Sequence, residues 1–307
     1  MRKTSLDCIY ELALKDDRVL FIGSDLGAGV LDDMRQTLPD RWLMEGIAEQ
    51  HIVGMAAGLA MNGFLPYVNT IATFLTRRCF EQIAVDLCLH NLPVTLVGNG
   101  GGVVYAPLGP THQAIEDIAI LRTLPNMTVV APCDADEMKR LMTQSLEWPG
   151  PLYIRLAKGG DKIVSLEKRG FTIGKGIVIE PPGEILFVST GVMTQRAIEA
   201  GEKLRLSGIN AGILHIHTIK PIDQQLLLST VEGVKFIVTL EEHVLTGGLG
   251  SAVLEVLNDS DALRDRKLLR LGIPDSFSCH YGSQDSLLES WHLSVDDVVM
   301  AVKKCMN

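Results

Sequence analysis

Short apolar runs alternate along the chain with longer segments whose apolar residues recur at helical spacing. The runs at 19–23 (VLFIG) and 94–98 (VTLVG) have the length of buried strands, whereas 46–62 carries its apolar positions at the spacing of a helix. In the first half this pattern predicts strands at 19–23, 42–44, 66–69, 94–98, 127–131 and 152–156, and helices at 46–62, 77–90, 112–122 and 135–147. Short strands separated by helices predict βαβ units on a parallel sheet.

The composition changes near residue 158, where glycine and lysine concentrate up to the Pro-Pro-Gly at 181–183. We interpret 161–184 as a linker between two α/β domains, one at 1–160 and one at 185–307. In the second domain the pattern predicts strands at 185–189, 211–217, 236–240 and 268–271, and helices at 195–207, 249–257 and 295–304.

Composition and charge narrow the class of protein. The chain has 307 residues, of which 47% are hydrophobic and 5% aromatic, and its net charge is −9. This much apolar surface excludes a disordered chain, and the acidic balance argues against a nucleic-acid or an anionic-membrane partner. No apolar stretch has the length of a transmembrane helix, and 1–17 predicts an amphipathic helix and not a signal peptide. The six cysteines lack metal-ligand spacing, which is typical of a cytoplasmic protein with reduced thiols.

The segment 44–51 (MEGIAEQH) places a carboxylate among small and apolar residues of a predicted helix. Gly54, Ala57 and Gly58 follow Glu49, and small residues allow another helix to approach closely. Desolvation at such a contact surface raises the pKa of a carboxyl group and makes it a proton donor or a strong hydrogen-bond partner. A glutamate near a helix N-terminus also complements the helix dipole, so Glu49 alone leaves both interpretations open.

Several motifs follow Glu49 in a fixed order. They are Thr70, Phe74, 78–82 (RCFEQ), a strand with a glycine-rich loop, 109–113 (GPTHQ), 116–119 (EDIA), 121–122 (LR), 125–126 (PN) and 131–132 (AP). This series resembles the pyrimidine-binding domain of the transketolase family, above all the separate C-terminal subunit of split transketolases. The 1-deoxy-xylulose-phosphate synthases and the 2-oxoacid dehydrogenase β subunits are more distant. The resemblance continues in the second half through 238–257 (VTLEEHVLTGGLGSAVLEVL).

The resemblance implies an α/β fold in which a doubly wound, parallel-sheet pyrimidine-binding domain precedes the smaller C-terminal α/β domain of transketolases. It also implies thiamine diphosphate as the cofactor. In the family, the glutamate at the position of Glu49 hydrogen-bonds the ring nitrogen of the aminopyrimidine. This bond favours the imino tautomer, whose exocyclic nitrogen removes the proton from the thiazolium carbon. The required dry, proton-sharing carboxyl group agrees with the residues around Glu49.

The resemblance implies further cofactor contacts by position. Family members usually place two phenylalanines three residues apart as walls for the pyrimidine, and here the second is Phe74 while Ile71 replaces the first. An ordinary core role for Phe74 stays open, and we expect Phe80 to be a wall or core residue. Asp25 and Leu26 occupy the turn with which family members reach the cofactor of the neighbouring subunit, although Asp25 suits a helix N-cap equally well.

The sequence departs from sugar transketolases at the substrate positions. Where those enzymes commonly have a histidine and an aspartate that contact the ketose hydroxyls, this chain has Gly100 and Leu108. The basic residue that would hold a substrate phosphate is Lys158 in place of the usual arginine, which removes the bidentate geometry of a guanidinium. His112 is retained, and it is our candidate for substrate binding or proton transfer. These changes make the site more apolar and leave the identity of the donor open.

The family's diphosphate-binding half is missing from this sequence. In the family a Gly-Asp-Gly motif, followed at a distance by an asparagine, holds Mg²⁺ and the diphosphate, and no such motif occurs here. We therefore expect an N-terminal, diphosphate-binding partner subunit that supplies the Mg²⁺ ligands, in an α₂β₂ heterotetramer to which this β subunit contributes Glu49. The small residues Gly54, Ala57 and Gly58 suit close packing against that partner, and ordinary packing within the domain explains them equally well.

Three functions remain open on the sequence. The first is the β subunit of a thiamine-diphosphate enzyme that transfers a two-carbon ketol unit from a ketose-type donor to an aldehyde acceptor. The second is a subunit of a 2-oxoacid-decarboxylating acyl or ketol transferase, or of a 1-deoxy-xylulose-phosphate-synthase-like enzyme, and Gly100 and Leu108 favour a 2-oxoacid donor. The third is a non-catalytic assembly subunit, against which the retained Glu49 argues.

Overall fold

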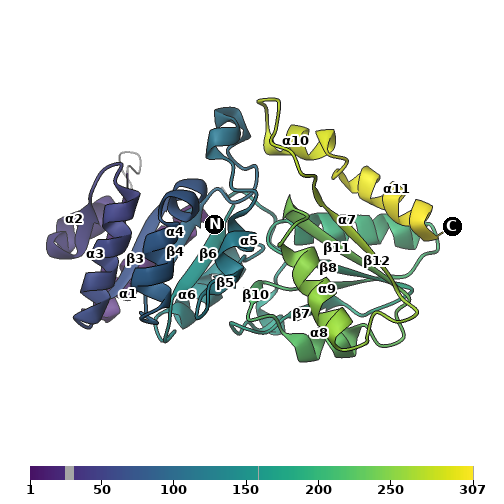
Figure 1. Cartoon of the computed structure of the whole chain (residues 1–307), viewed down its shortest axis with the longest axis horizontal. Coiled ribbons are helices and arrows are strands. Elements are labelled where there is room, and N and C mark those ends of the chain that lie inside the picture. Colours follow the sequence, from purple (N-terminus) through teal and green to yellow (C-terminus); the bar gives the residue numbers. More distant parts are fainter. Residues whose placement is uncertain (25–30, 158, 307) are drawn as a thin grey trace.

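The computed structural model describes residues 1–24, 31–157 and 159–306. They form two mostly parallel sheets with helices on both faces, and the sheets follow one another along the long axis of the molecule (Figure 1). The predicted succession of two α/β units is therefore confirmed. Within the described ranges, no helix combines the length and the apolar character that crossing a bilayer requires.

The first sheet is doubly wound. In spatial order its strands are β10 (Thr218–Lys220), β5 (Thr128–Val130), β6 (Leu152–Leu156), β4 (Thr95–Asn99), β3 (Leu65–Ile71), β1 (Val19–Gly23) and β2 (Trp42–Met44). All neighbours are parallel except β10 and β5. From β1 the chain moves first outward to β2 and then back past β1 to β3 and β4, so the winding direction reverses between β1 and β3.

Helices cover both faces of this sheet. One face carries α3 (Glu49–Met61), α5 (Asp117–Arg122) and a helical stretch made of Phe74–Arg78, α4 (Phe80–Gln82) and Ile83–Cys88; the other carries α1 (Arg2–Lys15) and α6 (Ala135–Ser145). The short α2 (Asp32–Thr37) lies on the connection from β1 to β2. The helix predicted at 77–90 thus begins earlier, and two π-helical stretches interrupt it, at Phe74–Arg78 and at Ile83–Cys88. Such π-helical turns are frequent at functional sites.

The second sheet is built in the same way. Its strands, in spatial order, are β12 (Lys267–Ile273), β11 (Phe236–Val244), β8 (Ile185–Ser189), β9 (Ala211–His215) and β7 (Ile177–Glu180). Only β7 is antiparallel to its neighbour. One face packs against α7 (Met193–Leu206), α10 (Gln284–Ser290) and α11 (Val295–Met306), and the other against α8 (Gln224–Thr230) and α9 (Leu249–Asp259).

Other features also differ from the predicted elements. The strand expected at 211–217 ends at His215, and the next strand, β10, crosses over to pair with β5 at the edge of the first sheet. Within the expected linker, β7 forms an edge strand on β9. The helix expected to begin at residue 112 begins at Asp117, because Ala114 is held in extended pairing with the backbone of Gly102.

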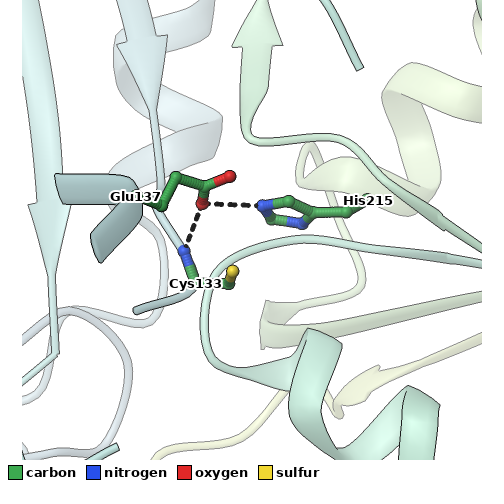
Figure 2. A group of neighbouring side chains, drawn as sticks. All are labelled: Cys133, Glu137 and His215. Atoms are coloured by element: carbon green, nitrogen blue, oxygen red, sulfur yellow. Dashed lines mark hydrogen bonds and ion pairs between the residues drawn. The ribbon is translucent and has the colours of Figure 1, made fainter. Parts of the chain in front are cut away.

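A buried polar network joins α6 of the first half to β9 of the second, as Figure 2 shows for its central residues. Glu137 Oε2 accepts the N–H of Cys133 at 2.7 Å and pairs with His215 Nε2 at 2.9 Å, while Glu137 Oε1 accepts the hydroxyl of Ser165 at 3.2 Å. His215 Nδ1 lies 2.8 Å from the hydroxyl of Thr194. Burial raises the pKa of the Cys133 thiol, so it stays neutral. The polar groups of Glu137 and His215 have protein partners, and we interpret the cluster as a hydrogen-bonded link between the halves.

Candidate active site

The candidate site lies at the carboxyl ends of β1 and β3, where the winding direction of the first sheet reverses. Doubly wound sheets bind ligands at such a point because the loops of the neighbouring strands diverge there. Glu49 begins α3 at this edge, and its side chain is only 3% exposed. Ser24, which directly follows β1, donates its hydroxyl to Glu49 Oε1 at 3.1 Å. The chain therefore presents a buried carboxylate that is held by the end of β1.

Arg78 connects Glu49 to the aromatic ring expected beside the cofactor. Its Nη1 donates to Glu49 Oε2 at 2.9 Å, and its guanidinium carbon lies 4.0 Å from the centroid of the Phe74 ring. A cation over an aromatic face is attracted by the negative face of the ring. The Phe74 ring also meets the His112 imidazole edge-on, at a centroid distance of 5.1 Å. Glu49, Phe74 and His112, which are distant in the sequence, thus form one continuous group.

The loop that carries His112 is fixed from both halves of the chain. At its base, Gly102 and Ala114 exchange two backbone hydrogen bonds of 2.8 and 2.9 Å. From the second half, the buried Glu242 accepts the N–H of Val103 at 2.8 Å. Near the end of the loop, the His112 side chain is partly exposed. The loop therefore offers an accessible imidazole on a backbone that is held in place.

The other predicted site residues are more dispersed. Ile71 ends β3 and is partly buried, whereas Phe80 packs against the hydrophobic core on the α3 face of the sheet. Leu108 is 50% exposed, in a short 3₁₀ turn that precedes His112. The remaining predicted contacts, Asp25, Leu26 and Lys158, lie outside the described residues. Their roles stay predictions.

Gly100 has a conformational reason to be glycine. It is buried, and its φ of +74° lies in the left-handed region that side chains with a Cβ disfavour. A Cβ at this position comes within 2.1 Å of the Tyr105 ring. The histidine that sugar transketolases commonly carry here has no room in this loop. The left-handed backbone and the Tyr105 ring therefore both favour glycine at this position.

We expect Gly100→Ala to lower the free energy of unfolding by about 1–3 kcal/mol, because the left-handed φ and the Tyr105 ring both oppose a Cβ. Gly58→Ala is the matched control, since a Cβ on Gly58 of α3 meets no atom within 4 Å. Alanine in a helix interior is favoured over glycine, by about 0.5–1 kcal/mol. Urea denaturation measures both effects, and equal midpoints for the two variants contradict the packing described for Gly100.

Sequence reasoning placed Ser24, Arg78 and Glu242 in a turn or in motifs, but it predicted none of the contacts that they make here. Arg78 carried a local signal, because it follows Phe74 by about one helical turn and side chains at that spacing meet. Ser24 also carried a weak one, as a hydroxyl directly after the first buried strand. The contact between Glu242 and Val103 joins residues 139 positions apart, and no local sequence pattern predicts it.

Comparisons with known proteins agree with this geometry. The pyrimidine binding domain of transketolase matches residues 1–160, and the C-terminal domain of transketolase matches residues 174–298. The 6-deoxy-6-sulfo-D-fructose transketolase subunit SqwH of Clostridium sp. (strain MSTE9) is 34% identical over 302 residues, which cover 98% of this chain and 92% of that protein. A 1-deoxy-D-xylulose-5-phosphate synthase of Caldanaerobacter subterraneus subsp. tengcongensis is 37% identical over 305 residues, covering 97% of this chain but 48% of that protein.

Solved structures give the same result. A split-gene transketolase, described as an inactive β4 tetramer, is similar with a TM-score of 0.90 at 35% identity, over 99% of this chain and 97% of that one. A transketolase variant from Pichia stipitis shares the fold, with a TM-score of 0.80 at 19% identity, although this chain covers only 45% of it. The chain belongs to the transketolase family, as a split transketolase-like subunit that joins the pyrimidine-binding and C-terminal domains.

Proposed function

We propose that this transketolase-like chain is the β subunit of a heteromeric, thiamine-diphosphate-dependent enzyme that transfers a two-carbon ketol unit from a ketose-type donor to an aldehyde acceptor. The observation that carries the proposal is the buried Glu49 carboxylate, linked through Arg78 to Phe74 and His112 at the reversal point of a pyrimidine-binding domain. A desolvated carboxyl group in such a position has the character that proton sharing with a ring nitrogen requires.

The contacts of Arg78 test whether an aminopyrimidine fits. A guanidinium is planar and carries N–H donors, and here it touches the Glu49 carboxylate and the Phe74 face at once. A planar heterocycle of the cofactor can make the same two contacts, so the residues fit the group. Thiamine diphosphate, when bound, supplies a centre that stores a carbanion. Glu49 would then hold a proton at the ring nitrogen, Phe74 would stack on the ring, and His112 would bind or protonate the substrate.

A partner subunit would complete the site. In the described residues, the one cluster of three potential metal ligands is Cys133, Glu137 and His215, whereas Mg²⁺ prefers oxygen ligands. The partner proposed here brings the diphosphate and Mg²⁺ ligands, in an α₂β₂ assembly. Support comes from relatives named as a transketolase subunit and as an inactive β4 tetramer.

Two exposed apolar residues lie at the ends of α3, the helix that Glu49 begins, and they fit such a partner. Ile47 is 71% exposed, and Met61 at the other end of α3 is 56% exposed. Between them, Gly58 has open space around its Cβ position, whereas Ala57 is buried in the core. Of the small residues singled out in the sequence, Gly58 therefore suits the interface best, and Ala57 packs within its own domain.

The donor is the least constrained part of the proposal. Leu108 is half exposed and Gly100 offers no side chain, so the polar contacts that sugar transketolases make at these positions are absent. A 1-deoxy-xylulose-phosphate-synthase-like reaction, with a 2-oxoacid donor, is the second candidate because 37% identity to such a synthase extends over 97% of this chain. A non-catalytic assembly role is disfavoured by the intact and buried Glu49.

Reconstitution tests the proposed function. We expect the chain alone to show no turnover, and the mixture with an N-terminal subunit from the same genome to transfer a ketol unit when thiamine diphosphate and Mg²⁺ are present. Ketose and pyruvate donors are assayed in parallel, each with an aldehyde acceptor, and the faster donor decides between the two candidates. Turnover of a ketose by the chain alone contradicts the split site, and a pair that is inactive with both donors contradicts the catalytic assignment.

A further inference from the structure

Arg78 occupies both of the contacts that the cofactor's pyrimidine requires. Its Nη1 donates to Glu49 Oε2 at 2.9 Å, and the guanidinium carbon lies 4.0 Å from the centre of the Phe74 ring. The proposed function assigns the same carboxylate to the ring nitrogen of the pyrimidine and the same aromatic face to stacking. A carboxylate oxygen can accept two hydrogen bonds, but the face of Phe74 that the guanidinium covers cannot also hold a stacked pyrimidine. The side chain of Arg78 and the pyrimidine therefore exclude each other.

We propose that Arg78 closes the pyrimidine site when the cofactor is not bound, in the assembled enzyme as in this chain, and that thiamine diphosphate binds only after displacing it. The inference rests on the proposed function, and it adds a residue of this chain that competes with the cofactor and sets its affinity. The guanidinium imitates the ring in three respects: it is planar, it donates an N–H to a carboxylate, and its delocalised π system stacks on an aromatic face.

The Arg78 side chain is free to leave the site. It is 45% exposed, so its outward movement uncovers little apolar surface, whereas the Glu49 side chain is 3% exposed and stays in place. Ser24 continues to hold Glu49 Oε1 after Arg78 has left. The π-helical turn at Phe74–Arg78 places both groups on one short segment. The ion pair is only partly buried, because Arg78 reaches solvent, and a ligand that bonds the Glu49 carboxylate in its place can displace it.

Competition of this kind lowers the apparent affinity for the cofactor. When only a fraction of the protein has an open site, the apparent dissociation constant equals the intrinsic constant divided by that fraction. Removing the Arg78 side chain opens every site and should tighten binding. Electrostatics predicts the opposite sign, because the loss of a cation disfavours an anionic cofactor. The direction of the change therefore separates the two effects.

The test is calorimetric titration of thiamine diphosphate with Mg²⁺ into the reconstituted pair. We expect Arg78→Ala to tighten binding roughly tenfold, and Arg78→Lys, which keeps the charge but lacks the planar fork, to lie between that variant and the wild type. Arg77→Ala is the matched control. It removes the neighbouring cation, whose partners are Glu116 and the carbonyl of Gln113, so it should leave affinity unchanged or slightly weaker.

Each outcome decides the inference. Tighter binding by Arg78→Ala with unchanged circular dichroism supports it, whereas equal or weaker binding overturns it and leaves the proposed function intact. If Arg78→Ala does not fold, Arg78→Lys decides alone. Lysine keeps the positive charge, so tighter binding of thiamine diphosphate by this variant than by the wild type is explained by the loss of the planar guanidinium. If the wild-type pair binds no thiamine diphosphate, the proposed function fails, and the inference about Arg78 fails with it.

Discussion

Replacing Glu137 by alanine is expected to lower the free energy of unfolding of the isolated chain by about 3–5 kcal/mol, because two buried groups lose the carboxylate oxygen that they share. Glu137 and His215 are fully buried, and they come from opposite halves of the chain. The variant leaves His215 Nε2 and the N–H of Cys133 without the oxygen they now share. Since this link spans the two halves, we expect the halves to unfold less cooperatively as well.

Chemical denaturation monitored by circular dichroism measures the effect. Glu137→Gln keeps an oxygen for the N–H of Cys133 and should lose much less stability than the alanine variant. Asp7→Ala is the control for an ordinary ion pair, because Asp7 and Lys3 form an exposed pair on α1 and such pairs contribute little. A Glu137→Ala protein that unfolds at the midpoint of the Asp7→Ala control shows that the buried link does not stabilise the fold.

The same network sets the sign of the pH dependence. Burial alone raises the pKa of Glu137, but His215 and its hydrogen bond outweigh that effect and lower the pKa from 4.5 to about 2. Burial lowers the pKa of His217 from 6.5 to about 3. Both groups bind fewer protons in the folded than in the unfolded chain, so stability falls as pH drops from 6.5 towards 2. Glu137→Ala should remove the contribution of Glu137, between pH 4.5 and 2, and leave that of His217, between pH 6.5 and 3.

Local pattern was enough to predict the sheets but not how they meet. Strands such as β1 and β4 are buried along their whole length and contain short apolar runs, so each stands out in the sequence without knowledge of its neighbours. The crossing of β10 to the edge of β5 depends on residues about ninety positions apart, and its three residues carry no periodicity. The helices α2, α8 and α10 have six or seven residues, which is too short for a helical pattern to be recognised.

The site was predictable to the extent that it depends on residue types in a fixed order. The ordered motifs predicted Glu49, Phe74 and His112 as site residues, and in the structure their side chains form one group through Arg78. The left-handed backbone at Gly100 explains a departure that the sequence only recorded. The spacing of Phe74 and Arg78 indicates that their side chains can meet, but the bond from Arg78 to Glu49 joins residues 29 positions apart and has no local signal in the sequence.

Replacing Glu49 by glutamine is expected to reduce the kcat of the reconstituted pair by about 10²–10⁴-fold, the usual contribution of a positioned acid or base. Glutamine keeps the size of the side chain and can still form hydrogen bonds with Ser24 and Arg78. Its amide does not ionise, so it cannot exchange a proton with a ring nitrogen. The fold and the assembly with the partner should therefore be preserved. Glu49→Asp, which keeps the carboxyl group but withdraws it by one methylene, should retain intermediate activity.

The kcat of the Glu49→Gln pair, measured at saturating thiamine diphosphate and Mg²⁺ with the assembly confirmed by light scattering, tests the central claim most directly. The claim is that this chain supplies the carboxylate of a cofactor site whose other half lies on a partner subunit. It predicts an intact complex with turnover reduced by at least about a hundredfold. An intact complex that retains the turnover of the wild type contradicts the claim.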